Sequence, residues 1–136
     1  EQGMKEKMEL FSQMDETQQL KETEKSGREL ADRFGLKSIV ITGVDVVCGD
    51  GSVKMGNLVI EENEADWYFS IKEGGSYSGT GDLFASVLSA GMVKGISMKE
   101  CVQKAIAFLA RAIHDAVLEG TDRNDGVCFE KYLKML

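Results

Sequence analysis

Residues 74–82, which read GGSYSGTGD, form a segment rich in glycine and hydroxyl side chains. They join an expected strand to an expected helix. Glycines at positions 79 and 81 let the main chain take positive φ angles and approach a ligand without a clash from Cβ. The first N–H groups of the helix have no acceptor within it and lie at the positive end of its dipole. We therefore predict an anion site suited to a phosphate group.

Asp82 adds a carboxylate to the first turn of that helix, beside the expected anion site. A carboxylate near a bound phosphate is repulsive unless it has a chemical role. The role that fits is to accept a proton from a hydroxyl group that attacks the terminal phosphoryl group. General-base assistance is worth roughly 10²–10⁴-fold in rate, and alignment and electrostatic stabilisation by loop amides and a bound cation supply most of the rest.

The spacing alone leaves a second interpretation open, in which the segment is a glycine-rich turn and Asp82 only favours the helix start. The segment is not a Walker A loop, because no Gly-Lys-Ser or Gly-Lys-Thr follows the glycines. The single histidine, His114, is expected at the surface. Arg123 could meet a phosphate, but its neighbours Asp122 and Asp125 favour a paired loop residue. No residue is predicted to be a metal ligand.

Composition limits the other classes of function. The 136 residues are 43% hydrophobic and 29% charged, which is typical of one globular domain. A formal charge of −7 argues against nucleic acid or an anionic membrane surface as a partner. No long apolar window and no apolar N-terminal segment are present, so we expect neither a membrane span nor a signal peptide. Three widely spaced cysteines indicate a reduced, cytoplasmic protein.

The elements before the loop begin with helical residues 1–35, read as one or two helices with a break between Asp15 and Thr17 and a C-cap at Gly35. Residues 38–43 form a β-branched apolar run, typical of a strand covered on both faces. Residues 49–52 predict a hairpin turn, and residues 53–60 an antiparallel partner. Residues 66–72 alternate as a half-exposed strand does. The sheet is therefore expected to be mixed.

Two helices follow the loop. Residues 79–94 carry almost no charge after the first turn, which predicts a buried helix. The next helix begins at Ser97, where Ser97 and Glu100 predict a capping box, and ends at Gly120. A polar loop over 121–128 and a short terminal helix over 129–136 complete the chain.

Residues 79–88, with Gly75 and Ser76 before them, resemble the signature of the ribokinase-like superfamily, and more narrowly its pyridoxal/pyridoxamine kinase branch. Residues 37–44 resemble that family's preceding strand and nucleotide-side loop, and residues 124–130 with Leu133 its C-terminal ending. The resemblance implies the C-terminal half of a three-layer α/β domain, with a mixed, mostly parallel sheet flanked by helices. Residues 36–136 would form its nucleotide- and phosphate-binding part.

The resemblance also implies roles for residues. Asp82 would be the base acting on the substrate's hydroxymethyl group, and the amides of Gly79, Thr80, Gly81 and Asp82 would form the anion hole. Nucleotide-binding positions would be Thr42, Gly43, Ser76 and Tyr77. ATP and Mg²⁺ would be used to phosphorylate a pyridoxal-type vitamer, and the full-length protein would be a homodimer.

Family members are about twice this length. Their first half supplies most of the ring pocket and the Asn-x-x-Glu region that helps to hold magnesium, and Glu22-Thr23-Glu24 is no substitute for that region. Two alternatives therefore stay open: a hydroxymethylpyrimidine or other ribokinase-like kinase, and a non-catalytic nucleotide-binding fragment or subunit.

Overall fold

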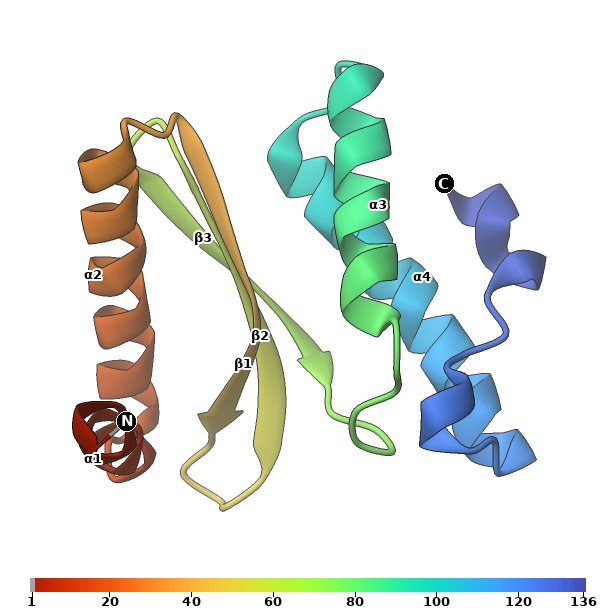
Figure 1. Cartoon of the computed structure of the whole chain (residues 1–136), viewed down its shortest axis with the longest axis horizontal. Coiled ribbons are helices and arrows are strands. Elements are labelled where there is room, and N and C mark those ends of the chain that lie inside the picture. The colour runs from red at the N-terminus through yellow and green to blue at the C-terminus, as the bar shows by residue number, and fades with distance from the viewer. Residues whose placement is uncertain (1) are drawn as a thin grey trace. The chain divides into compact units, whose positions relative to one another are not determined.

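The computed structural model describes residues 2–136 (Figure 1). The chain divides into two compact units, one ending at Phe69 and the other running from Ser70 to Leu136. The first unit contains two helices and most of a three-stranded sheet. The second contains two α-helices and two short 3-10 helices. The functional division into 1–35 and 36–136 stays a prediction.

Helices α1 (Gln2–Ser12) and α2 (Glu16–Phe34) confirm the two-helix interpretation of the N-terminal segment. Asp15 caps α2 by accepting a hydrogen bond from the Gln18 amide at 2.9 Å, and the Gln18 side chain accepts one from the Asp15 amide at 3.1 Å. This reciprocal capping box separates the two helices. Gly35 ends α2 with a left-handed φ of 62°, as predicted.

The sheet consists of β1 (Ser38–Val47), β2 (Val53–Glu61) and β3 (Glu64–Ile71), in the order β1-β2-β3. β1 and β2 are antiparallel, and the turn between them is closed where the Cys48 amide donates to the Ser52 carbonyl at 2.8 Å. Glu62 and Asn63 join β2 to β3 with φ angles of 49° and 70°. Two consecutive positive φ angles are the mark of a tight hairpin turn. The hairpin predicted at residues 49–52 is confirmed, and the structure adds a second one at Glu62 and Asn63.

Two expectations about the sheet require correction. The mostly parallel, three-layer arrangement is not confirmed, because the strands of the described residues are joined by tight hairpins and parallel pairing needs a longer crossover. The strand expected to be covered on both faces is also more open than predicted. β1 is terminal in the sheet, and among its residues only Val46 is buried.

Helix α2 packs closely against the sheet of the first unit (Figure 1). Gly27 allows the approach, because a Cβ there would lie 2.6 Å from Cδ1 of Ile60 and 3.2 Å from Cδ1 of Ile41. The indole N–H of Trp67 donates to the Glu24 carboxylate at 2.9 Å. The contact between α2 and the sheet therefore combines close apolar packing at Gly27 with a hydrogen bond from Trp67 of β3.

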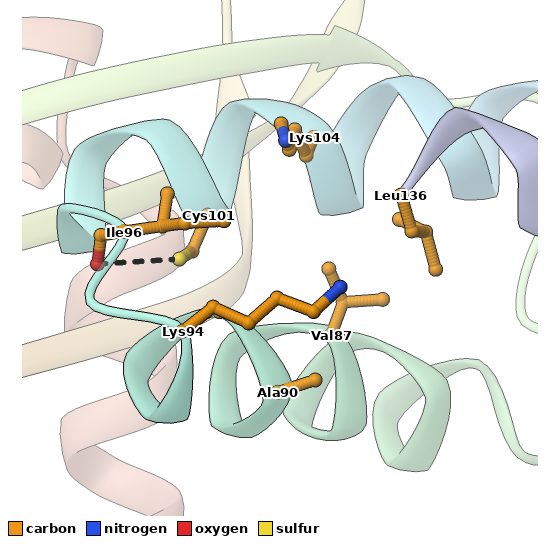
Figure 2. Close-up of a pocket in the computed structure, with 8 residues that line it drawn as sticks. Val87, Ala90, Lys94, Ile96, Cys101, Lys104 and Leu136 are labelled. Carbon is orange, nitrogen blue, oxygen red and sulfur yellow. Dashed lines mark hydrogen bonds between the residues drawn. The ribbon is translucent and has the colours of Figure 1, made fainter.

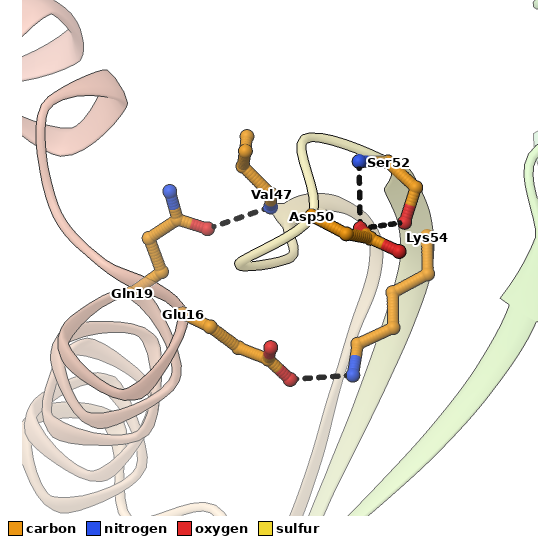
Figure 3. A network of polar contacts seen from close by, with 6 residues as sticks. All are labelled: Glu16, Gln19, Val47, Asp50, Ser52 and Lys54. Carbon is orange, nitrogen blue, oxygen red and sulfur yellow. Dashed lines mark hydrogen bonds and ion pairs between the residues drawn. The ribbon is translucent and has the colours of Figure 1, made fainter.

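Polar side chains also join α2 to the turn between β1 and β2 (Figure 3). Gln19 is 1% exposed, accepts a hydrogen bond from the Val47 amide at 3.1 Å and donates one to the Met14 carbonyl at 3.0 Å. The Lys54 ammonium lies 2.6 Å from the Glu16 carboxylate. A buried amide with both groups satisfied fixes geometry, because either partner left alone would be costly.

The second unit is built on α3 (Thr80–Val93) and α4 (Met98–Glu119), which pack against each other. The Ser97 hydroxyl accepts a hydrogen bond from the Glu100 amide at 3.3 Å, and Gly120 ends α4. The second half of the expected capping box is absent from the described contacts of Glu100, whose carboxylate instead lies 3.8 Å from the Lys104 ammonium.

The prediction that α3 is wholly buried is wrong. Its buried residues are Phe84, Val87 and Gly91, which lie at helical spacing on one face. The opposite face, including Ala85, Ser86 and Ser89, is exposed. The low charge of α3 therefore indicates an uncharged outer face rather than an element enclosed on all sides.

The C-terminal residues fold back on α4 through η1 (Arg123–Asp125) and η2 (Glu130–Met135), both 3-10 helices. The Tyr132 hydroxyl donates to the Asp115 carboxylate at 2.5 Å, and the Lys131 ammonium lies 2.5 Å from the same group. The predicted short terminal helix is confirmed, although it is tighter than an α-helix. Within residues 2–136, no helix has the length and apolar content needed to cross a membrane.

Candidate functional site

The start of α3 is open. Gly79 is the N-cap residue, with a φ of 77° and no side-chain cap hydrogen bond. A Cβ at Gly79 or Gly81 would meet no atom within 4 Å. The expected positive φ is found at Gly79 but not at Gly81, which lies in the first helical turn. The amides of Gly81 and Asp82 lie in the first helical turn, where amides have no intrahelical acceptor, as an anion site requires. The Thr80 amide donates to the Tyr77 carbonyl at 3.5 Å.

Asp82 is exposed at this helix start. Its main-chain carbonyl accepts the Ser86 hydroxyl at 2.7 Å, which leaves the carboxylate out of the contact. Among residues 2–136, the Asp82 carboxylate makes no ion pair or hydrogen bond. It is therefore free to accept a proton from a ligand.

A hollow of about 270 Å³ lies beside the helix start. Asp82 and Asp125 both line it, so its polar side is acidic, while Leu83, Val127 and Phe129 supply an apolar side. All of its lining residues belong to the second unit, between Ser78 and Phe129. A small polar molecule with an apolar ring would find both kinds of surface here.

The loop before α3 is held in place by its tyrosine. Tyr77 is 6% exposed and packs in a buried cluster with Ala112, Ala116 and Val127. Its carbonyl accepts the Thr80 hydroxyl at 2.9 Å. Tyr77 therefore anchors the loop through its ring, and its nucleotide-binding role stays a prediction.

Further contacts tie the same loop to α4 and to the segment after it. Glu73 lies 3.0 Å from Nδ1 of His114, which is at the surface as expected. The Ser78 amide donates to the Arg123 carbonyl at 2.8 Å. Gly126 has a φ of 79°, and a Cβ there would lie 3.0 Å from the Ser78 carbonyl oxygen. The loop is thus held on two sides by residues that local sequence signals do not connect to it.

Comparison with known proteins identifies the family of this chain. Residues 4–126 match the model of the phosphomethylpyrimidine kinase family. The chain belongs to this family. No significant match is found among curated proteins.

Solved structures agree with the family. A protein of Bacteroides thetaiotaomicron, assigned as a phosphomethylpyrimidine kinase, is 25% identical with a TM-score of 0.73, over 83% of this chain and 38% of that one. A second crystal form of it, which contains pyridoxal, gives 25% identity and a TM-score of 0.74 over 84% and 40%. Pyridoxal kinase from Lactobacillus plantarum gives 25% and 0.59 over 71% and 34%.

The resemblance to ribokinase-like kinases is therefore confirmed. The chain spans 34–40% of the length of these neighbours.

The remaining predicted site residues of this family member lie in two places. Ser76 is exposed in the loop before α3. Thr42 and Gly43 lie in the first unit, at a bulge of β1 where the register with β2 shifts between Ile41 and Val44. The Thr42 hydroxyl is 2.6 Å from Oδ1 of Asn57, a buried residue that the sequence reasoning did not single out. The roles of Thr42, Gly43 and Ser76 stay predictions.

The two cofactors expected of a kinase fit the described residues differently. The open amides at the start of α3 fit a phosphate group of ATP. Within residues 2–136 no group of three or more histidine, cysteine, aspartate or glutamate side chains could hold a metal ion.

A smaller hollow of about 30 Å³ lies at the other end of α3, where Lys94 and Ile96 lead into α4 (Figure 2). The Cys101 thiol donates to the Ile96 carbonyl at 3.8 Å, and burial raises the pKa of this thiol. The volume is close to that of one water molecule. This hollow therefore does not compete with the one beside Asp82 as a substrate site.

Proposed function

We propose that this chain is the phosphate-binding part of an ATP-dependent kinase that phosphorylates the hydroxymethyl group of a pyridoxal-type vitamer. The observation that carries the proposal is the free Asp82 carboxylate beside the uncapped start of α3. Membership of a kinase family and a neighbour crystallised with pyridoxal support the same substrate class. A homodimer and a cytoplasmic location are parts of the proposal that rest on the sequence alone.

In the proposed reaction, Asp82 takes the proton of the hydroxymethyl group. The hydroxymethyl oxygen bonds to the γ-phosphorus of ATP, and the bond from that phosphorus to the bridging oxygen breaks, so that ADP leaves. The amides of Gly79, Thr80, Gly81 and Asp82 would hold the transferred phosphoryl group, where fixed donors stabilise the developing charge. Magnesium, when bound, would neutralise negative charge on the ATP phosphates.

Proton transfer supplies only part of the rate enhancement in phosphoryl transfer. Orientation of the alcohol therefore contributes together with deprotonation. The apolar side of the hollow, formed by Leu83, Val127 and Phe129, is suited to contact an aromatic ring.

A second candidate is phosphorylation of hydroxymethylpyrimidine, which the name of the matching family favours. A third is nucleotide binding without catalysis, which the limited coverage of the neighbours favours. The three differ in a simple way. Only the first two transfer a phosphoryl group, and they differ in the preferred alcohol.

The test measures ATP binding by calorimetry and product formation by mass spectrometry, with pyridoxal and hydroxymethylpyrimidine as competing alcohols. We expect ATP binding and a higher kcat/KM for pyridoxal. A preference for the pyrimidine would establish the second candidate, and binding without turnover of either alcohol the third. No binding of ATP would refute all three.

A further inference from the structure

Arg123 lies against the loop that leads into α3. Its guanidinium atoms Nη1, Cζ and Nη2 are 3.0, 3.1 and 3.3 Å from the point where a Cβ on Gly75 would be. Its carbonyl accepts the Ser78 amide at 2.8 Å. The main chain of Arg123 is therefore hydrogen-bonded to Ser78, which lies four residues before Asp82, and its guanidinium lies beside Gly75.

Arg123 forms no ion pair with the acidic residues beside it in the sequence. The sequence favours a pair with Asp122 or Asp125, but among the described residues the guanidinium makes no ion pair. Asp122 instead accepts the Asn124 amide at 2.8 Å, and Asp125 lines the hollow beside Asp82. The expected loop pair is thus replaced by an exposed cation facing a main-chain turn.

A cation at this place would offset the negative charge of the site. The chain has a formal charge of −7, and the polar side of the hollow is formed by the carboxylates of Asp82 and Asp125. The helix start offers partial positive charge for one phosphate group, but a nucleotide brings further negative charge. Two other cations of this unit are engaged in ion pairs, because Lys131 lies 2.5 Å from Asp115 and Lys104 lies 3.8 Å from Glu100.

We propose that Arg123 binds the nucleotide phosphates that lie beyond the one held at the start of α3, over the Gly74–Gly75 turn. A guanidinium group has a planar set of donors that matches two phosphate oxygens at once. Gly75 contributes by having no side chain, since a Cβ would displace the guanidinium. This inference rests on the proposed kinase function and extends it by a further binding residue.

The test is calorimetric binding of ATP, ADP and adenosine to the wild-type chain and to Arg123→Ala, Arg123→Lys and Arg111→Ala. Arg111 is the matched control, because it is an exposed arginine of the same unit on α4. We expect Arg123→Ala to weaken ATP and ADP about tenfold, as for loss of a charge-assisted hydrogen bond. Adenosine binding and the Arg111→Ala variant should change less than about twofold.

Arg123→Lys keeps the charge and should lose less affinity than Arg123→Ala, so it also serves if the alanine variant does not fold. Equal loss for adenosine would move the contact to the nucleoside and overturn the inference, as would unchanged ATP affinity in both Arg123 variants. If the wild-type chain binds no ATP, the proposed function itself fails. If the wild type binds ATP and the Arg123 variants bind it equally well, only the inference fails.

Discussion

Nδ1 of His114 lies 3.0 Å from Oε1 and 3.2 Å from Oε2 of Glu73. This contact joins the last third of α4 to the residue that begins the loop before α3. The next residue, Gly74, lies against the same helix, where a Cβ would be 2.4 Å from Cγ2 of Val117. Glu73 and Gly74, at the start of the loop before α3, are thus both held against α4.

Replacing His114 by Ala should loosen the start of this loop. Both side chains are partly exposed, so we expect a loss below about 1 kcal/mol in the free energy of unfolding. The larger effect should be faster amide hydrogen exchange over residues 74–78, measured by mass spectrometry. Glu73→Gln, which keeps a hydrogen-bonding group, should have a smaller effect. Unchanged exchange in this segment for His114→Ala would show that the contact between Glu73 and His114 is not needed to hold the loop.

Asp82→Asn should separate binding from catalysis. Loss of a general base lowers kcat by roughly 10²–10⁴-fold, while the open helix start still binds the phosphate. We therefore expect kcat for pyridoxal phosphorylation to fall and the Kd for ATP to stay within about twofold, because the amide keeps the shape of the side chain. Asp32→Asn is the control, since it removes an exposed carboxylate from α2 in the other unit. A near wild-type kcat in Asp82→Asn would contradict the assignment of the base.

The cluster of Asp115, Lys131 and Tyr132 should make the C-terminal turn sensitive to pH. Hydrogen bonds from Lys131 and then Tyr132 lower the pKa of Asp115 below 3.8. A lowered pKa in the folded state adds stability above the unfolded value, and this is lost as pH falls through the folded value. The Asp115 hydrogen bond raises the pKa values of Lys131 above 10.5 and of Tyr132 above 10.0, so their contribution is lost at high pH.

We therefore expect η2 to stay docked between about pH 4 and pH 10 and to loosen outside this range, as measured by NMR chemical shifts of residues 130–135. Asp115→Asn should weaken the docking of η2 at every pH and abolish the acid-side transition, because it removes the group that titrates there. Glu119→Gln is the matched control, since Glu119 lies farther from the Lys131 ammonium, at 3.7 Å. Identical titration curves for the wild type and Asp115→Asn would contradict this account.

Gly27→Ala should destabilise the first unit although alanine is the better helix former. The added methyl would lie 2.6 Å from Cδ1 of Ile60, and overpacking costs about 1–3 kcal/mol. The higher helix propensity of alanine offsets about 1 kcal/mol of this cost. We therefore expect the free energy of unfolding, measured with denaturant, to fall by about 1 kcal/mol. Gly3→Ala in α1, with no atom within 4 Å of its Cβ position, should be neutral or stabilising. A Gly27→Ala variant as stable as Gly3→Ala would show that the isoleucine side chains move aside freely.

Local signals predicted much of the fold. The cap at Gly35, the turn at 49–52 and the cap at Ser97 are each fixed by residues within a few positions, and all three are found. Burial was predicted less well. The apolar composition of α3 and β1 suggested elements enclosed on every side, but enclosure depends on what packs beside them, which no local pattern contains.

The same limit applies to the site. Gly79 and Asp82 are neighbours in sequence, so their spacing predicted a helix start with a carboxylate beside it. The contacts of that loop with His114, Arg123 and Gly126 join residues 41 or more positions apart. Arg123 shows this most clearly. Its sequence neighbours, Asp122 and Asp125, indicated an ion pair, but in the structure its guanidinium lies beside Gly75.

The bulge at Thr42 and Gly43 has a consequence for how β1 meets other chains. β1 is terminal in the sheet order of the described residues, so its outer side offers main-chain donors and acceptors to a passing strand. The register shift between Ile41 and Val44 breaks their regular spacing near the middle of the strand. A strand from another chain could therefore pair with two short segments of β1 but not with its full length. This makes fibrillar self-association through this edge less favourable.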